Sequence, residues 1–219
     1  MAETKERTAV RPKKRFHHGD LREALIAATR ELLIGHGPDG FTLADACRRA
    51  GVTTAAPYKH FRDKQEILEE IVLRGFAELT AANAKAVAEG GPGTIAGITA
   101  MGISYLNFAV AQPAVFRLMF GHKSEILKVQ QVDESGKQCL KHVIDEVAAY
   151  SRKHGHTADA EKIALRLWTF VHGASSLELD QDYERVAPGL DVHELIADVT
   201  PLLLGTIADK RAPSRGRKR

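Results

Sequence analysis

The sequence lacks most of the features that mark secreted proteins and β-sheet proteins. It has two cysteines, Cys47 and Cys139, which lie far apart at apolar helical positions, so we expect packed thiols rather than a disulfide. The N-terminus is charged and has no apolar core of the kind that a signal peptide needs. No segment alternates apolar and polar residues as a half-buried strand does. These absences predict an all-α protein in the reducing cytoplasm.

Motifs for catalysis are missing as well. The chain contains no Gly-x-Ser-x-Gly nucleophile elbow, and Gly91, Gly93 and Gly97 are not followed by the Gly-Lys-Ser/Thr of a phosphate-binding loop. The adjacent His17 and His18 have no Cys, Asp or Glu at metal-ligand spacing. We therefore expect no catalytic residue, no metal and no cofactor. An enzyme that uses an enclosed pocket with histidines is the rival interpretation, and turnover of a bound compound would favour it.

Charged residues are absent from residues 90–116, a run long enough to cross a bilayer. The run nevertheless contains many glycines and threonines, two prolines, and Ser104, Asn107 and Gln112. This polarity suits a buried helix of a soluble bundle better than a membrane span, so we expect no membrane partner.

The formal net charge of +3 is distributed unevenly along the chain. Residues 1–19 carry +4 and residues 210–219 carry +6, which leaves residues 20–209 at −7. Basic ends beside a DNA-binding element could follow the DNA backbone or enter its minor groove, and solvated tails explain them equally well. We expect both ends, residues 1–18 and 210–219, to be disordered.

Residues 41–64 have the pattern of two short helices joined by one tight turn. Thr42 can cap the first helix, and Gly51 suits the left-handed backbone at its end. A threonine at position 53 or 54 can cap the second helix, which places Pro57 in a first turn, where its missing amide has no intrahelical partner. This is the geometry that places a second helix in the DNA major groove, although an ordinary helical hairpin with a solvated basic face has the same pattern.

The outward residues of this hairpin suit DNA. The second helix offers Tyr58, Lys59, His60, Arg62 and Lys64 as donors to phosphate oxygens, with Phe61 as its buried anchor. The residues before it are small enough to approach base edges, and these are Thr53, Thr54, Ala55 and Ala56.

Three motifs in this region resemble the DNA-binding domain of the tetracycline-repressor (TetR) type of bacterial regulators. They are Phe41-Thr42, Ala50-Gly51-Val52-Thr53 and Tyr58-x-His60-Phe61-x-x-Lys64, within a similarity that spans about residues 16–75. The resemblance implies that Thr42, Tyr58, His60 and Lys64 touch phosphates, and that residues 53–56 lie near the bases. The sequence departs from the family at Pro57, which stands where an aliphatic residue is usual.

The other segments have the three-to-four spacing of amphipathic helices. Asp20 with Glu23 forms a capping box that starts the first helix, and Asp63 caps a helix that leaves the first domain. After a break at residues 90–93, Thr94 caps an uncharged helix and Pro113 starts another. Further helices are expected over residues 124–151, 158–179 and 192–207, the last kinked at Pro201.

The helix expected over residues 158–179 has two apolar stripes. A helix that is apolar on two sides must be covered on two sides, which suits one face on its own core and one on a partner subunit. The first stripe is Ile163, Leu167, Phe170, Ala174 and Leu177, and the second is Ala164, Trp168, Val171 and Ser175.

A second resemblance covers roughly residues 90–207. Tyr105-x-x-Phe108-Ala109, Pro113-x-x-Phe116-Arg117-Leu118-Met119-Phe120 and Trp168-x-x-x-His172-Gly173 resemble the ligand-binding domain of the TetR branch named for its Trp-His-Gly signature. It implies a homodimer that pairs through the last two long helices. Simple core packing is the alternative for the aromatic residues, and a satisfied core or interface histidine is the alternative for His172. The residues that we expect to line a ligand pocket are Met101, Tyr105, Phe108, Phe116, Met119, Phe120, Trp168 and His172.

Together these patterns predict a three-helix helix-turn-helix domain over residues 19–66 and a helical ligand-binding and dimerisation bundle over residues 67–209. The function that we expect is a cytoplasmic repressor, a homodimer that binds double-stranded DNA at a palindromic operator and is released by a small apolar effector. A helical dimer that binds DNA constitutively, without a ligand, is the alternative.

Overall fold

The computed structural model describes residues 18–55, 57–121, 130–157 and 159–205, and within these ranges the chain forms helices and turns without a strand. The prediction of an all-α protein is therefore confirmed for this part of the chain. Several predictions fall outside the described residues. They concern the basic N-terminal arm and His17, Ala56 near the bases, the start of a helix at residue 124, and the basic tail at residues 210–219.

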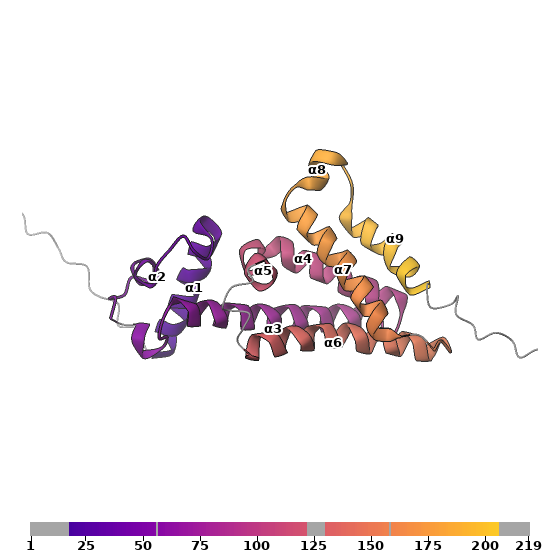
Figure 1. The fold of residues 1–219 in the computed structure, drawn as a ribbon, viewed down its shortest axis with the longest axis horizontal. Helices are drawn as coiled ribbons and strands as arrows, with labels where there is room; N and C mark the ends of the chain where they lie inside the picture. Colours follow the sequence, from indigo (N-terminus) through magenta and orange to yellow (C-terminus); the bar gives the residue numbers. More distant parts are fainter. Residues whose placement is uncertain (1–17, 56, 122–129, 158, 206–219) are drawn as a thin grey trace, which may run out of the picture.

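Four elements form a small head at one end of the molecule (Figure 1). They are α1 (His18–His36), α2 (Leu43–Ala50), the 3₁₀ turn η1 (Pro57–Lys59) and the start of α3 (Lys64–Gly90). Helix α1 begins two residues before Asp20, so the start predicted there is wrong, as is common at helix ends. The apolar cluster that these elements bury continues along α3 into the rest of the molecule. Its members in the head include Leu25, Ile26, Phe41, Cys47, Phe61, Ile67 and Leu68.

The first half of the hairpin follows its sequence closely. Thr42 and Asp45 form a capping box at the start of α2, and Gly51 ends the helix at φ 72°. The second half differs, because the α-helix expected after Thr54 is a single turn in which the carbonyl of Pro57 accepts from the amides of His60 and Phe61. The chain then restarts at Asp63, whose side chain caps α3 as predicted. The second element of the hairpin, which we expected to contact DNA, is thus shorter than predicted.

The second half of the molecule is a bundle around α3. Helix α4 crosses α3 and carries α7 and α9 on its other side, while α6 runs alongside α3 (Figure 1). Thr94 caps α4 and Pro113 opens α5, as predicted. The helices are α4 (Ile95–Ala111), α5 (Pro113–Phe120), α6 (Gln130–Lys153), α7 (Ala160–Leu179), α8 (Asp182–Val186) and α9 (Val192–Gly205).

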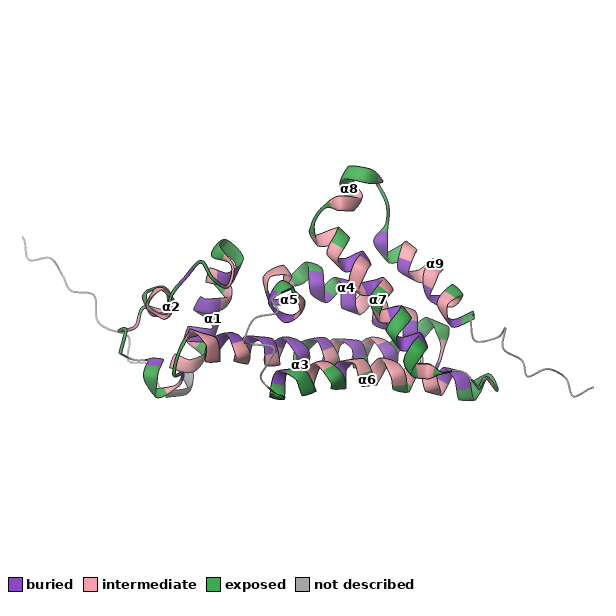
Figure 2. Cartoon of the chain, viewed as in Figure 1, coloured by how far each residue is buried: buried purple, intermediate pink, exposed green. Residues whose placement is uncertain are grey.

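Helix α3 belongs to both halves. It is continuous for 27 residues, and its buried positions recur along its whole length (Figure 2). The limit predicted between residues 66 and 67 therefore falls inside one helix. Helix α5 rests against α3 at Gly75, where an added Cβ would lie 2.6 Å from the sulfur of Met119. The close contact couples α5 to the helix that starts at the head.

Among the described helices, none alone is long and apolar enough to cross a membrane. Helices α4 and α5 would pass such a test together, but they meet at an angle of 108°.

Candidate DNA-binding surface and ligand cavity

Most of the predicted DNA-contacting residues lie on the surface of the head. Tyr58 is 65% exposed although it follows the buried Pro57. Its ring is therefore held out by the η1 turn, which Phe61 anchors from below. His60 is half-buried, and the other exposed members of the group are Thr42, Thr53, Thr54, Ala55 and Lys59. Their roles toward phosphates and bases stay predictions, as does that of Ala56.

Lys64 is positioned differently from the other predicted phosphate contacts. Its Nζ donates to the carbonyls of Pro38 and Phe41 at 3.0 and 2.9 Å, and it lies 5.0 Å from the centre of the Phe41 ring. The ammonium therefore connects the start of α3 to the loop before α2 and holds this loop in place. An ammonium has three donors, so one remains for a phosphate.

Ion pairs connect α1 to α3 within the head. Arg74 contacts Glu23 at 2.6 Å and Glu70 at 2.7 Å, and Arg22 contacts Glu70 at 2.9 Å. The hydrogen bond from Arg74 lowers the pKa of Glu23, and that from Arg22 lowers the pKa of Glu70. Both carboxylates are therefore ionised at neutral pH and hold the two helices in one orientation.

A second polar group connects α1 to the corner between α4 and α5. Arg30 donates to Glu78 at 2.8 Å and to Gln112 at 3.2 Å, and Gln112 donates to Glu78 at 2.9 Å. Burial raises the pKa of Glu78, but the hydrogen bonds from Arg30 and Gln112 outweigh it, so the pKa is lowered. Because Gln112 also lies between α4 and α5, these three side chains link the head to the helix that lies against the cavity.

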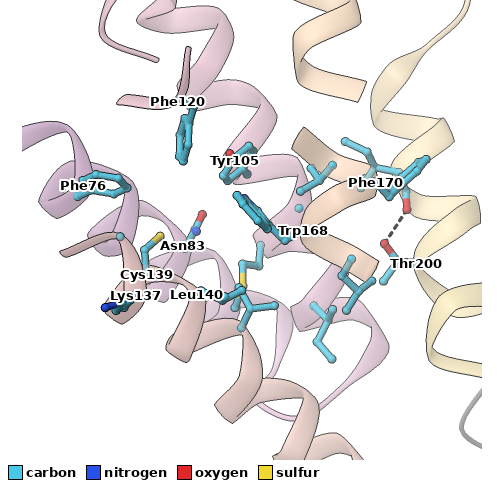
Figure 3. A pocket seen from close by; sticks show the side chains of 18 of the residues that line it. Phe76, Asn83, Tyr105, Phe120, Lys137, Cys139, Leu140, Trp168, Phe170 and Thr200 are labelled. Atoms are coloured by element: carbon cyan, nitrogen blue, oxygen red, sulfur yellow. Dashed lines mark hydrogen bonds between the residues drawn. The ribbon is translucent and has the colours of Figure 1, made fainter. Parts of the chain in front are cut away.

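A cavity of about 350 Å³ lies inside the second half of the molecule, where α3, α4, α5, α6, α7 and α9 converge (Figure 3). This volume is at the lower end of the range for small-molecule sites. Its apolar walls include Phe76, Ile98, Met101, Phe120, Val132, Leu140, Val143, Leu167, Trp168, Phe170, Val171 and Ile196.

The polar side chains of the cavity are few and mostly engaged. The hydroxyl of Tyr105 lies 2.9 Å from Nδ1 of His172, and that of Thr200 donates to a backbone carbonyl. Burial raises the pKa of Tyr105 and lowers the pKa of His172, so we assign a neutral tyrosine that donates to a neutral imidazole. Asn83 is the exception, because its buried Oδ1 has no hydrogen-bond partner.

The structure separates the eight residues predicted to line a ligand pocket. Four line the cavity, and these are Met101, Tyr105, Phe120 and Trp168. Phe116 and His172 instead line an open hollow of about 630 Å³ between the end of α1, α5 and α7, and Phe120 lines both spaces. Phe108 and Met119 line neither and are buried in the core. The wall that Tyr105, Phe120 and His172 share therefore separates the cavity from the junction with the head.

Several residues of the cavity were not anticipated from the sequence, chiefly those of α3 and α6. Asn83 had a readable signal, because it continues the buried stripe of Phe76 and Leu79 toward Val87. A polar residue in such a stripe is a candidate for a buried contact. The α6 residues, such as Cys139 and Leu140, have no signal of this kind, since only the packing of α6 beside α3 brings them to the cavity.

One of the two apolar stripes of α7 was expected to face its own core and the other a partner. The chain itself buries Ala164, Val171 and Ser175 of the second stripe, whereas Leu177 of the first is 41% exposed. The apolar residues that remain on the outside are Leu165 and Leu177 on α7 and Leu202, 69% exposed, on α9. An added Cβ at Gly173 would meet nothing within 4 Å, so this face is open to a close neighbour.

No group of three or more His, Cys, Asp or Glu side chains in the described part of the chain is placed to hold a metal ion.

Comparisons with known proteins agree with this arrangement. Residues 25–71 match the family described as bacterial regulatory proteins, tetR family, and residues 98–200 match the tetracyclin repressor-like C-terminal domain. No curated protein matches the sequence significantly. Among solved structures, a protein of unknown function from Rhodococcus sp. RHA1 is 32% identical, with a TM-score of 0.76 over 88% of this chain and 98% of its own.

Two more distant structures share the fold. A TetR family transcriptional regulator, PfmR of Thermus thermophilus, is 16% identical, with a TM-score of 0.61 over 82% of this chain and 96% of its own. The ketosteroid transcriptional regulator KstR2 of Mycobacterium tuberculosis is 15% identical, with a TM-score of 0.60 over 85% and 94%. These two structures show the same fold, and the two family models show the family. The narrower assignment to the Trp-His-Gly branch stays a prediction.

Proposed function

The chain belongs to the tetR family of bacterial regulatory proteins, and from this premise we propose that it is a repressor released from its operator by a small, largely apolar molecule. DNA-binding transcriptional regulation follows from the family. The repressor role, the effector and the dimer are our proposals, as is its place in the cytoplasm, where bacterial DNA lies.

The observation that carries this proposal is the position of α3. The helix begins directly after the exposed residues of η1, and farther along it contributes Phe76 and Asn83 to the cavity wall. A molecule in the cavity therefore touches the same rigid element that sets the direction of the head. The Arg30, Glu78 and Gln112 group and the contact of Gly75 with Met119 give α5 two further connections to α1 and α3.

We propose that two subunits pair through the outer face of α7 and α9. Leu165, Leu177 and Leu202 leave apolar area exposed there, and the open Gly173 permits two helices to approach closely. The need for a dimer also follows from the head, because one short reading element makes few base contacts. Two heads on a symmetric dimer can read half-sites about 34 Å apart.

Release requires the effector to prefer one of two arrangements of the heads. A ligand with equal affinity for both would shift nothing, however tightly it bound. We propose that the occupied cavity favours a spacing of the two heads that does not match the operator.

The test begins with selection of bound fragments from random or genomic DNA, for which we expect an inverted repeat. Affinity for this DNA is then measured across salt concentrations for Lys59→Ala and Thr54→Ala. Loss of the Lys59 contact should weaken binding to all sequences and reduce the salt slope by about 1, whereas Thr54→Ala should change preference among sequences. Lys85→Ala, an exposed lysine on α3 beyond the head, is the matched control and should change neither. Recovery of no inverted repeat would contradict the proposal.

The constitutive dimer remains the competing hypothesis. If the cavity binds an apolar ligand, the melting temperature should rise with the concentration of that ligand, because the ligand binds only the folded state. A screen in which no apolar compound stabilises the protein would favour constitutive binding.

A further inference from the structure

Among the described residues that line the cavity, Asn83 has a buried side-chain oxygen without a hydrogen-bond partner, and this oxygen indicates what kind of molecule fits. Asn83 is 2% exposed, and its Oδ1 accepts no hydrogen bond. In Figure 3 the side chain points into the space bounded by Phe76, Phe120, Tyr105 and Trp168. A buried acceptor that is left unpaired is unfavourable, and native structures rarely keep one without a reason. A ligand that donates a hydrogen bond would satisfy it.

The remaining walls exclude a buried charge on the ligand. Among the described residues that line the cavity, Asp133 and Lys137 are the charged ones. They contact each other at 2.6 Å, and more than half of each side chain is exposed, so they belong to the rim. Cys139 and Tyr105 stay neutral because burial raises the pKa of each. An ionised group beside Asn83 would have no counter-charge, which makes its transfer from water costly.

We propose that the effector is a neutral, mostly apolar molecule that donates a hydroxyl or amide hydrogen to Oδ1 of Asn83. The proposal rests on the proposed function, since it names the chemistry of the effector for that cavity. Because Asn83 is part of α3, the hydrogen bond forms on the helix that carries the head. The same hydrogen bond would thus select the effector and connect it to the helix that leads to the DNA-binding head.

A matched set of probes, each with an unbranched ten-carbon chain, tests this proposal by calorimetry on the full chain without DNA. The set is 1-decanol, which donates and accepts, its methyl ether 1-methoxydecane, which only accepts, and decanoate, which is charged at pH 8. We expect decanol to bind about five- to tenfold more tightly than the ether, because the ether leaves Asn83 unpaired. Decanoate should bind at least tenfold more weakly than decanol. Equal affinities for alcohol and ether would overturn the proposal, as would the absence of binding by all three probes.

Two variants identify the residue responsible. Asn83→Leu, close in shape but without the acceptor, should remove the preference for the alcohol and bind the ether more tightly than the parent does. Thr200→Val is the control, because the Thr200 hydroxyl also lies at the cavity but already donates to Ile196. It should keep the alcohol preference within about twofold. An alcohol preference that survives in Asn83→Leu would assign the contact elsewhere and overturn the proposal.

The rim provides the competing outcome. If decanoate binds most tightly and loses that affinity in Lys137→Met, the site recognises an acid at Lys137 and the proposal is wrong. DNA binding is measured separately, so the two proposals can fail independently. Donor-dependent binding without release of DNA would contradict the repressor mechanism alone, whereas release by apolar compounds without the donor preference would contradict this inference alone.

Discussion

The two halves of the molecule are both helical, but they differ in how completely their interiors are filled. In the head, a capping box closes the start of α2, buried side chains fill the core, and charged groups pair across α1 and α3. In the second half, longer helices enclose an unfilled volume that contains the unpaired Asn83. The comparison teaches that the head is packed to keep one shape, while the second half retains a cavity and an unpaired acceptor, which suit the ligand site that we propose.

Matched leucine truncations should give the largest contrast between the halves. Leu25 in the head is fully buried, so Leu25→Ala should lower the free energy of unfolding by about 3 kcal/mol. Leu140 already borders the cavity and is half-buried, so Leu140→Ala should lower it by only about 1 kcal/mol. Chemical denaturation followed by circular dichroism measures both. Equal losses would mean that the two halves are packed alike.

Substitution of two lysines in the head should affect the stability of the fold to different degrees. Lys64→Met removes two hydrogen bonds to backbone carbonyls and should lower the free energy of unfolding by about 2 kcal/mol. Lys59→Met, at an exposed position, should leave it within about 0.5 kcal/mol of the parent. The measurement is again denaturation, without DNA. If Lys64→Met were neutral for folding, the lysine would not hold the loop in solution.

The ion pairs between α1 and α3 should make the head sensitive to acid. Glu23 and Glu70 have pKa values below their ordinary 4.5, so their contribution is present above pH 4.5 and is lost as the pH falls through the lowered values. Arg74→Met should therefore lower the free energy of unfolding by about 1 kcal/mol at pH 7 and by less near pH 3. A loss that does not depend on pH would show that Arg74 acts by packing alone.

The smallest effect is expected at the wall between the cavity and the junction. Burial lowers the pKa of His172 from its ordinary 6.5. The contribution of the neutral imidazole to the free energy of unfolding is therefore fully present above pH 6.5 and is lost as the pH falls through the lowered pKa. Asn at this position keeps an acceptor for Tyr105 but does not titrate. The melting temperature of His172→Asn should thus decline less than that of the parent between pH 7 and pH 5. Parallel declines would exclude His172 as the titrating group.

Local chemistry made most of the fold predictable. The caps at Thr42, Asp63 and Thr94 and the proline at Pro113 act within one turn of the chain, so the sequence states them directly. The η1 turn was misjudged because Pro57 is acceptable in a helix start but does not require a helix to follow. Its single turn depends on the restart at Asp63.

The cavity was predictable only in part, because tertiary packing selects its walls. Tyr105 and Phe120 were correctly predicted to line the cavity because aromatic residues cluster in this segment. Phe108 and Met119 lie in the same segment and are equally apolar, but they are buried in the core. The two stripes of α7 illustrate the same limit. The second stripe is largely covered within the chain, whereas Leu177 of the first is 41% exposed, and the periodicity of a single helix does not specify which stripe faces outward.

The continuity of α3 turns it into a lever. Asn83 and Lys64 are separated by 19 positions of unbroken helix, which is about 28 Å. A tilt of about 5° around Asn83 would swing the Lys64 end by about 2.5 Å, and opposed swings in a symmetric pair would add to about 5 Å, more than the roughly 3.4 Å step between base pairs. In the mechanism that we propose, the stiffness of α3, rather than a hinge, would convert a small adjustment at the cavity into a mismatch of register on DNA.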